Sequence, residues 1–164
     1  MADPSPFRHA DADASPGFLL WKLTSLWQRT LGELLDGFGI TQTKYAILAS
    51  LRWFEGQGTV VTQNDLAEHA RLERMTLSKA IRKLEADGLV LRAPSAVDGR
   101  ATAARLSAKG RRLTERAVVA IEEADEVFFG TLSAPHQESW KALVLELIAG
   151  NSQASAGSVH QVAH

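Results

Sequence analysis

Cysteine is absent from the 164-residue chain. Disulfide bonds, thiolate metal ligands and a thiol-based redox switch are therefore excluded within this chain. Long hydrophobic runs are also missing, because no stretch approaches the roughly 20 apolar residues of a membrane-spanning helix. The acidic start of the chain, with Asp3, Asp11 and Asp13, does not fit a secretory signal, which begins with a basic segment. We therefore expect a cytoplasmic protein with no membrane association.

The motifs of common enzyme classes are missing as well. The sequence has no glycine-rich phosphate-binding loop and no serine in a nucleophile-elbow pattern. The five histidines are dispersed, and the two that lie four residues apart, His160 and His164, fall in a polar C-terminal stretch. We therefore expect no enzymatic activity, no cofactor and no metal site, and a histidine site shared between subunits remains an alternative.

Positive charge is scarce overall but concentrated in the centre of the chain. Residues 62–116 carry 12 Lys and Arg against 7 Asp and Glu, whereas the whole chain carries 18 against 19. The remainder is therefore acidic, with 6 basic and 12 acidic residues. Phosphate neutralisation depends on a local excess of cations, so the central segment suits a nucleic acid even though the net charge is −1.

Two helices joined by a short turn are predicted in this central segment. The hydroxyl of Thr62 and the carboxylate of Asp65 form a capping pattern that marks the start of the first helix. The second helix is predicted over residues 74–86 and ends before Asp87-Gly88. Its apolar residues form one narrow stripe at helical periodicity: Leu77, Ala80, Ile81 and Leu84. The turn between the helices lacks the glycine that helix-turn-helix motifs often carry.

The opposite face of the second helix suits a DNA major groove. It carries Met75, Ser78, Lys79, Arg82 and Lys83. Lysine and arginine donate hydrogen bonds to guanine or phosphate, serine bonds to either, and methionine can touch a thymine methyl group. A solvated helix face that is merely basic is the alternative interpretation.

A hairpin is predicted directly after this helix. Residues 89–93 are prone to form a strand, Asp98-Gly99 is a strong turn signal, and residues 101–106 supply the return strand. An arginine at such a tip, here Arg100, is attracted into a DNA minor groove, and Asp98 is placed to hold its guanidinium. The alternative is an ordinary surface hairpin with a local ion pair.

Helices are predicted on both sides of the centre. Residues 17–36 are apolar on nearly all sides, which favours burial against a second subunit over a thick monomer core. Thr41 is predicted to cap the next helix, and Val60-Val61 to add a short strand. Ser107 is predicted to cap a helix reaching Phe129. A last helix starts at Ser133 and is expected to bury Trp140, Leu143, Val144, Leu147 and Ile148.

The central segment resembles the winged helix-turn-helix of MarR-type transcriptional regulators. The resemblance covers about fifty residues closely and residues 17–149 more loosely. It rests on these stretches, in this order: Thr62-Gln63-Asn64-Asp65-Leu66-Ala67, Thr76-Leu77, Leu84-Glu85-Ala86-Asp87-Gly88-Leu89-Val90, Asp98-Gly99-Arg100, and Leu106-Ser107-Ala108-Lys109-Gly110-Arg111-Arg112-Leu113. Glu73 departs from the family, which often has a short capping residue there.

The resemblance implies a mainly α-helical fold with a small β-wing. It implies one domain over residues 17–150, and the composition of the stretches on either side, residues 1–16 and 151–164, predicts disordered tails. Within that domain, residues 41–106 form the DNA-binding lobe, and residues 17–37 and 107–149 form dimerisation helices. The implied function is sequence-specific regulation of transcription by a homodimer that binds a pseudo-palindromic duplex as a repressor.

The resemblance also assigns the contact residues. Those expected to contact DNA are Arg74, Met75, Thr76, Ser78, Lys79, Arg82 and Lys83 in the second helix, with Asp98 and Arg100 in the hairpin turn. A small aromatic effector is expected in a cleft lined by Trp21, Trp27, Tyr45 and Trp53, for which plain core or interface packing is the alternative. A regulator without an effector and a helical module for an acidic protein partner remain the alternative functions.

Overall fold

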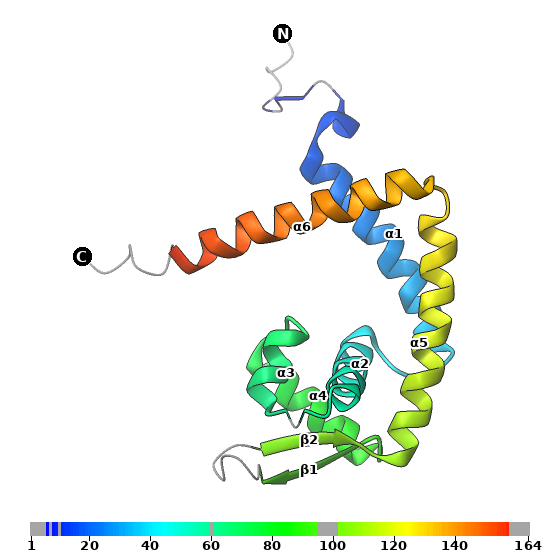
Figure 1. Ribbon diagram of the computed structural model, residues 1–164, viewed down its shortest axis with the longest axis vertical. Helices are drawn as coiled ribbons and strands as arrows, with labels where there is room; N and C mark the ends of the chain where they lie inside the picture. The colour runs from blue at the N-terminus through cyan, green and yellow to red at the C-terminus, as the bar shows by residue number, and fades with distance from the viewer. Residues whose placement is uncertain (1–5, 7, 10, 60, 95–101, 158–164) are drawn as a thin grey trace, which may run out of the picture. The chain divides into compact units, whose positions relative to one another are not determined.

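The fold is taken from a computed structural model that describes residues 6, 8–9, 11–59, 61–94 and 102–157 (Figure 1). The chain divides into two compact units, Met1–Ala124 and Asp125–His164. A short 3-10 turn over Ala12–Ala14 is followed, in chain order, by α1 (Pro16–Asp36), α2 (Gln42–Gly56), α3 (Gln63–His69), α4 (Arg74–Ala86), β1 (Val90–Pro94), β2 (Thr102–Leu106), α5 (Ala108–Phe129) and α6 (Ala134–Gly157). The predicted mainly helical fold with a two-stranded wing is confirmed.

Local capping chemistry fixes where the helices begin. Thr41 accepts a hydrogen bond from the backbone of Lys44 at the start of α2. Thr62 and Asp65 form the predicted reciprocal capping box at the start of α3. Hydrogen bonds from the backbone and hydroxyl of Thr62 hold the pKa of Asp65 below its ordinary value. Ser107 caps α5 by accepting from the backbone of Gly110.

The wing is a two-stranded antiparallel sheet with one face in the core. Val90 lies opposite Leu106, and Arg92 lies opposite Ala104. Val90, Ala104 and Leu106 are buried, because alternate residues of a strand point to the same side. On the other edge of β2, Thr62 forms an isolated bridge with Ala103, so the third strand predicted at Val60-Val61 is only this bridge. Val60 lies outside the described residues.

One hydrophobic core joins the wing to the helices of the first unit. Helices α2, α3 and α4 pack against one another, and β1 and β2 lie beneath them (Figure 1). The core draws its largest fully buried side chains from five elements: Leu35, Ile47, Leu48, Leu51, Leu66, Leu77, Ile81, Leu84 and Val90. This packing holds α4 by one side and leaves its other side free.

Helix α5 joins this core through a close backbone contact. A Cβ atom at Gly110 would lie 1.9 Å from the carbonyl oxygen of Leu89, so only glycine fits. Ser107 reinforces the contact, because its backbone nitrogen donates to Leu89 and its hydroxyl donates to Gly88. The start of α5 is therefore fixed against the turn between α4 and β1.

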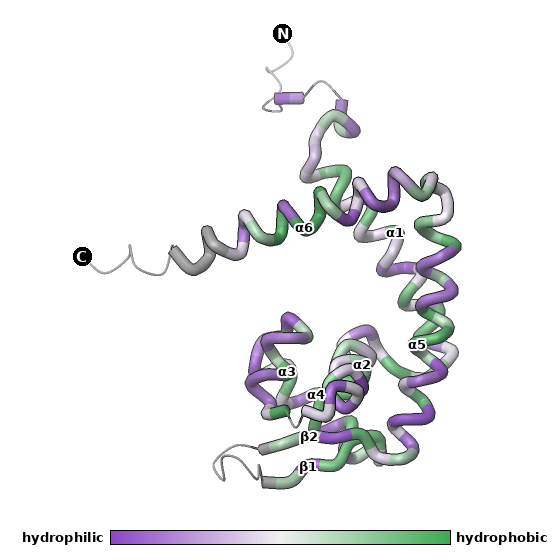
Figure 2. The backbone as a smooth tube through the Cα atoms, viewed as in Figure 1, coloured by the Kyte–Doolittle hydropathy of each residue, from purple (hydrophilic) through white to green (hydrophobic). Residues whose placement is uncertain are grey.

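The expectation that α6 buries its apolar residues is wrong within this chain. Leu143, Leu147 and Ile148 are exposed, and Trp140 and Val144 are half-buried. Hydrophobic stretches also mark α1, where Leu19, Leu20 and Trp21 are exposed (Figure 2). Helix α6 also continues to Gly157, into the stretch from residue 151 that was expected to be disordered. Helical periodicity identified these apolar faces, but it does not say what covers them.

The contact at Gly110 gives a prediction about stability. A Gly110→Ala change should destabilise the fold by about 3 kcal/mol, because the backbone of α5 or of Leu89 has to move. Gly32→Ala is the matched control inside α1, where the new methyl group makes only an ordinary contact at 3.6 Å. It should stabilise the helix by about 1 kcal/mol. Urea unfolding measures both changes, and equal free energies of unfolding for the two variants would contradict the prediction.

Candidate nucleic-acid interface

Helix α4 presents an exposed basic face. Its buried stripe, Leu77, Ile81 and Leu84, points into the core, so the opposite face points to solvent. The predicted contact residues lie on this exposed side: Arg74, Met75, Thr76, Lys79, Arg82 and Lys83 are exposed, and Ser78 is half-buried. Met75 is 69% exposed, which is unusual for a large apolar side chain and fits a surface meant to be covered.

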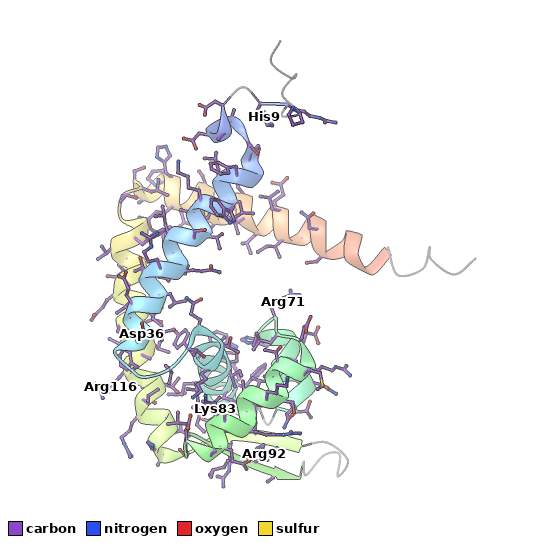
Figure 3. The ribbon with its side chains drawn as sticks, turned by 180° about the vertical axis from the view of Figure 1, so that it is seen from behind. His9, Asp36, Arg71, Lys83, Arg92 and Arg116 are labelled. Atoms are coloured by element: carbon purple, nitrogen blue, oxygen red, sulfur yellow. The ribbon has the colours of Figure 1, made fainter. Side chains whose placement is uncertain are left out.

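The cations of this face are available to a partner. Among the described residues, no hydrogen bond or ion pair engages the side chains of Arg74, Lys79 or Arg82. Lys83 lies near the C-terminal end of the helix (Figure 3), where its charge helps to lower the pKa of Asp87. The face therefore offers unpaired donors that can bind phosphate oxygens or the acceptors of guanine.

The turn before α4 is built without glycine. Arg71 takes the left-handed conformation there, with φ of 52°, and the backbone nitrogen of Leu72 donates to Ala67 at 2.9 Å. Glu73 is the capping residue of α4 and makes no side-chain hydrogen bond to it. Helix α4 nevertheless begins at Arg74, as the sequence predicts, so the departure at Glu73 does not shift its start.

The end of α4 is held by two lysines from other helices. Lys44 of α2 pairs with the Asp87 carboxylate at 2.6 Å, and Lys109 of α5 donates to the Asp87 carbonyl at 3.0 Å. The hydrogen bond from Lys44 is the main reason that the pKa of Asp87 lies below its ordinary value. Gly88 follows in the left-handed region, with φ of 71°, and ends the helix as predicted.

An ion pair also ties the wing to α4. Arg92 of β1 donates from Nε to Oε2 of Glu85 at 2.7 Å, and Figure 3 labels Arg92 on the strand next to this helix. The predicted tip residues Asp98 and Arg100 lie outside the described residues, so their roles stay predictions. The sequence pattern did not single out Lys44 or Arg92, whose partners are known only once the helices are packed.

The four aromatic residues expected around an effector differ in their exposure, and their role at an effector site stays a prediction. Trp21 is 64% exposed and Trp53 is 60% exposed. Trp27 and Tyr45 are partly buried and pack against the core. None of the four lines the hollows found in the described part of the chain, whose walls come from α5 with Phe38, from the α5–α6 hairpin, and from the base of the wing.

Other kinds of site find no support in the residues that the structure describes. Their His, Asp and Glu side chains form no group of three or more that could hold a metal ion. None of their helices is long and apolar enough to cross a membrane. The free basic face of α4, the turn before it and the wing beside it are the features of a winged helix-turn-helix DNA-binding protein.

Comparison with known proteins gives the same class. Residues 36–124 match the family model described as ArnR1-like, winged-helix domain. The HTH-type transcriptional regulator YdcH of Bacillus subtilis is 32% identical over 136 residues, which are 83% of this chain and 91% of that protein. The HTH-type transcriptional repressor Rv2887 of Mycobacterium tuberculosis is 30% identical over 135 residues, which are 82% of this chain and 94% of that protein.

Solved structures share the fold. A MarR-family transcriptional regulator from Silicibacter pomeroyi superposes with a TM-score of 0.71 at 20% identity, over 89% of this chain and 96% of that one. The MepR–DNA complex of S. aureus superposes with a TM-score of 0.76 at 23% identity, over 85% of this chain and 99% of that one. The chain belongs to the ArnR1-like winged-helix family and is a DNA-binding transcriptional regulator of the HTH type, and it shares its fold with the MarR-family structures.

The exposed cations of α4 give a prediction about DNA binding. Lys79→Ala and Arg82→Ala should each weaken binding to a specific duplex by roughly fivefold to a hundredfold. A residue that contacts phosphate should also reduce the slope of log K against log salt by about 0.9, whereas one that contacts a base should relax the preference at one position. Lys141→Ala removes the same charge from α6, which is not part of the helix-turn-helix, and should change little. Fluorescence anisotropy at several salt concentrations measures all three, and equal losses for the three variants would contradict the assignment.

Proposed function

We propose that this chain is a homodimeric repressor that binds one pseudo-palindromic operator and leaves it when a small aromatic effector binds. It acts in the cytoplasm and carries out no catalysis. The observation that carries the DNA-binding part is the exposed, unpaired basic face of α4 opposite its buried stripe. In this proposal two copies of α4 enter major grooves about one helical turn apart, roughly 34 Å, and the wings contact the outer flanks.

Exposed apolar side chains on the terminal helices support the homodimer. Helix α1 exposes Phe18, Leu19, Leu20, Trp21 and Leu26 within the first unit. Helix α6, within the second unit, exposes Leu143, Leu145, Leu147 and Ile148. Contiguous apolar surface of this kind typically marks a protein–protein contact. A second copy of this chain supplies the same two helices in return, as a two-fold interface requires.

Repression is the part of the proposal that rests on relatives. The Mycobacterium tuberculosis relative is named a repressor, and its similarity extends over most of both chains. The basic lobe also suits steric repression, because a dimer seated on a promoter prevents other proteins from binding there. The relatives are regulators without a named enzymatic role, which supports the non-catalytic part.

Selection of bound fragments from a random duplex pool tests the function directly. The selected site should be a pseudo-palindrome with half-site centres about 10 base pairs apart, because two α4 helices related by two-fold symmetry read one face of the duplex. Binding should weaken steeply with added salt. A purified protein that is monomeric and binds no duplex even in dilute buffer would overturn the proposal.

A variant of α6 separates dimerisation from DNA contact. Leu147→Glu places a charge on the exposed apolar face without removing a core residue, and it should give a monomer in sedimentation analysis. Its affinity for the selected palindrome should fall towards that for a single half-site. Ser139→Glu adds the same charge at an exposed polar position of α6 and should remain dimeric.

The effector is the second part of the proposal. Trp27 of α1 and Tyr45 of α2 support it, because both rings pack half-buried where the proposed dimerisation helix meets the DNA-binding lobe. Trp21 and Trp53 are exposed, so within the single chain neither ring supports an effector site. A regulator controlled without a ligand is the alternative.

Intrinsic tryptophan fluorescence distinguishes these two cases. In a titration with a broad panel of aromatic acids and phenols, one or more compounds should change the emission of the wild-type protein. Trp27→Phe should reduce this change. The same compound should release the selected duplex. A panel without any response would favour regulation without a ligand, and tight binding to an acidic protein in place of DNA would favour an interaction module.

A further inference from the structure

A single carboxylate from α2 crosses the junction between the wing and α5. Glu55 lies in the last turn of α2, and its Oε1 accepts a hydrogen bond from the backbone nitrogen of Leu106 at 3.1 Å. Its Oε2 lies 2.9 Å from Nη2 of Arg111. Leu106 is the last residue of β2, and Arg111 is in the first turn of α5. One side chain therefore contacts the end of the wing and the start of the long helix at once.

The Glu55 carboxylate is largely buried, so its charge needs compensation by its contacts. The side chain is 19% exposed, whereas that of Arg111 is 47% exposed. The Oε2 atom itself is inaccessible to solvent and accepts no hydrogen bond from the described residues, so its charge is compensated there by the ion pair with the Arg111 guanidinium. A buried carboxylate is costly unless its charge is compensated, so the positions of Glu55 and Arg111 are strongly coupled.

Apolar packing does not fix the wing on this side. A hollow of about 390 Å³ lies at the base of the wing, and the residues that line it include Leu51, Val61, Ala93 and Ala103 as well as Glu55 and Arg111. Alanine side chains are too short to interlock across such a space. The other face of the hairpin is well packed, since Val90 and Leu106 are buried there. On this edge, beyond the bridge between Thr62 and Ala103, the Glu55 carboxylate is the polar contact that holds the end of β2.

We propose that Glu55 is a positioning residue that sets the orientation of the wing relative to α5. This inference rests on the proposed function, in which the wing contacts the outer flank of the operator and α5 belongs to the dimerisation region. In this proposal the position of the wing depends on the position of α5, because the carboxylate that binds Leu106 is itself held by Arg111. Glu55 touches no DNA in this proposal and acts only through β2.

A neighbouring ion pair provides a matched control. Arg52 of α2 donates from Nε to Oε1 of Glu115 in α5 at 2.9 Å. It joins the same two helices as the Glu55–Arg111 pair, one turn further along α5, and neither partner forms a hydrogen bond or an ion pair with the described residues of the wing. Loss of this pair reports on the attachment of α5 to α2 alone.

The experiment compares Glu55→Gln with Glu115→Gln on two duplexes, the selected operator and a version trimmed at both outer flanks. Glutamine keeps an oxygen acceptor for Leu106 but loses the charge that holds Arg111. Both variants remove one negative charge, which alone would slightly strengthen DNA binding. We expect Glu55→Gln to weaken binding to the full operator by about tenfold. Its binding to the trimmed duplex, and both affinities of Glu115→Gln, should stay within twofold of wild type.

A second variant keeps the test valid if Glu55→Gln does not fold. Arg111→Gln removes the same ion pair from its more exposed partner, and circular dichroism on heating verifies that each variant is folded. The ratio of full-operator to trimmed-duplex affinity should fall in Arg111→Gln as in Glu55→Gln. The double variant should show no larger fall than either single variant, because all three lose one shared interaction.

The outcomes separate this inference from the proposed function. A wild-type protein that binds no duplex overturns the proposed function. Wild-type binding with an unchanged affinity ratio in folded Glu55→Gln or Arg111→Gln overturns only the positioning role. Equal weakening on the full and trimmed duplexes also overturns it, because that result means a general loss of the DNA-binding lobe.

Discussion

Burial of one narrow apolar stripe on α4 is the constraint on which the rest of the structure depends. Leu77, Ile81 and Leu84 leave water almost completely, and each such side chain contributes roughly 1.5–3 kcal/mol. Their burial fixes the rotation of α4 about its axis, and with it the direction of Lys79 and Arg82. In the proposed function, the basic face of α4 can serve as an interface because the buried stripe on the opposite side of the helix fixes its orientation.

The elements that sequence reasoning located best are those whose signals are local. The bounds of α4, the capping box at Thr62 and Asp65, and the stop at Gly88 depend on residues within one or two turns of each other. The same is true of the hairpin strands, apart from a shift of about one residue. Hydrophobic periodicity then indicated which side of each helix is apolar.

The features that sequence reasoning missed depend on contacts between residues far apart in the chain, or on what lies outside the single chain. Lys44 and Asp87 are 43 residues apart, and Glu55 and Leu106 are 51 apart, so no local pattern connects them. The apolar residues of α6 recur at helical spacing, but this spacing does not say whether another surface covers them. Tryptophans occur in cores, in interfaces and in pockets, and their spacing in the sequence alone does not distinguish these roles.

The left-handed conformation of Arg71 restricts how this sequence can vary. A residue with a Cβ atom is strained there by roughly 1 kcal/mol, and a β-branched one such as valine or isoleucine is strained further. The strain of such a replacement would be relieved most easily by rotation of the peptide that leads into α4. Natural variation at position 71 should therefore be confined to glycine, asparagine and unbranched side chains, whatever their charge.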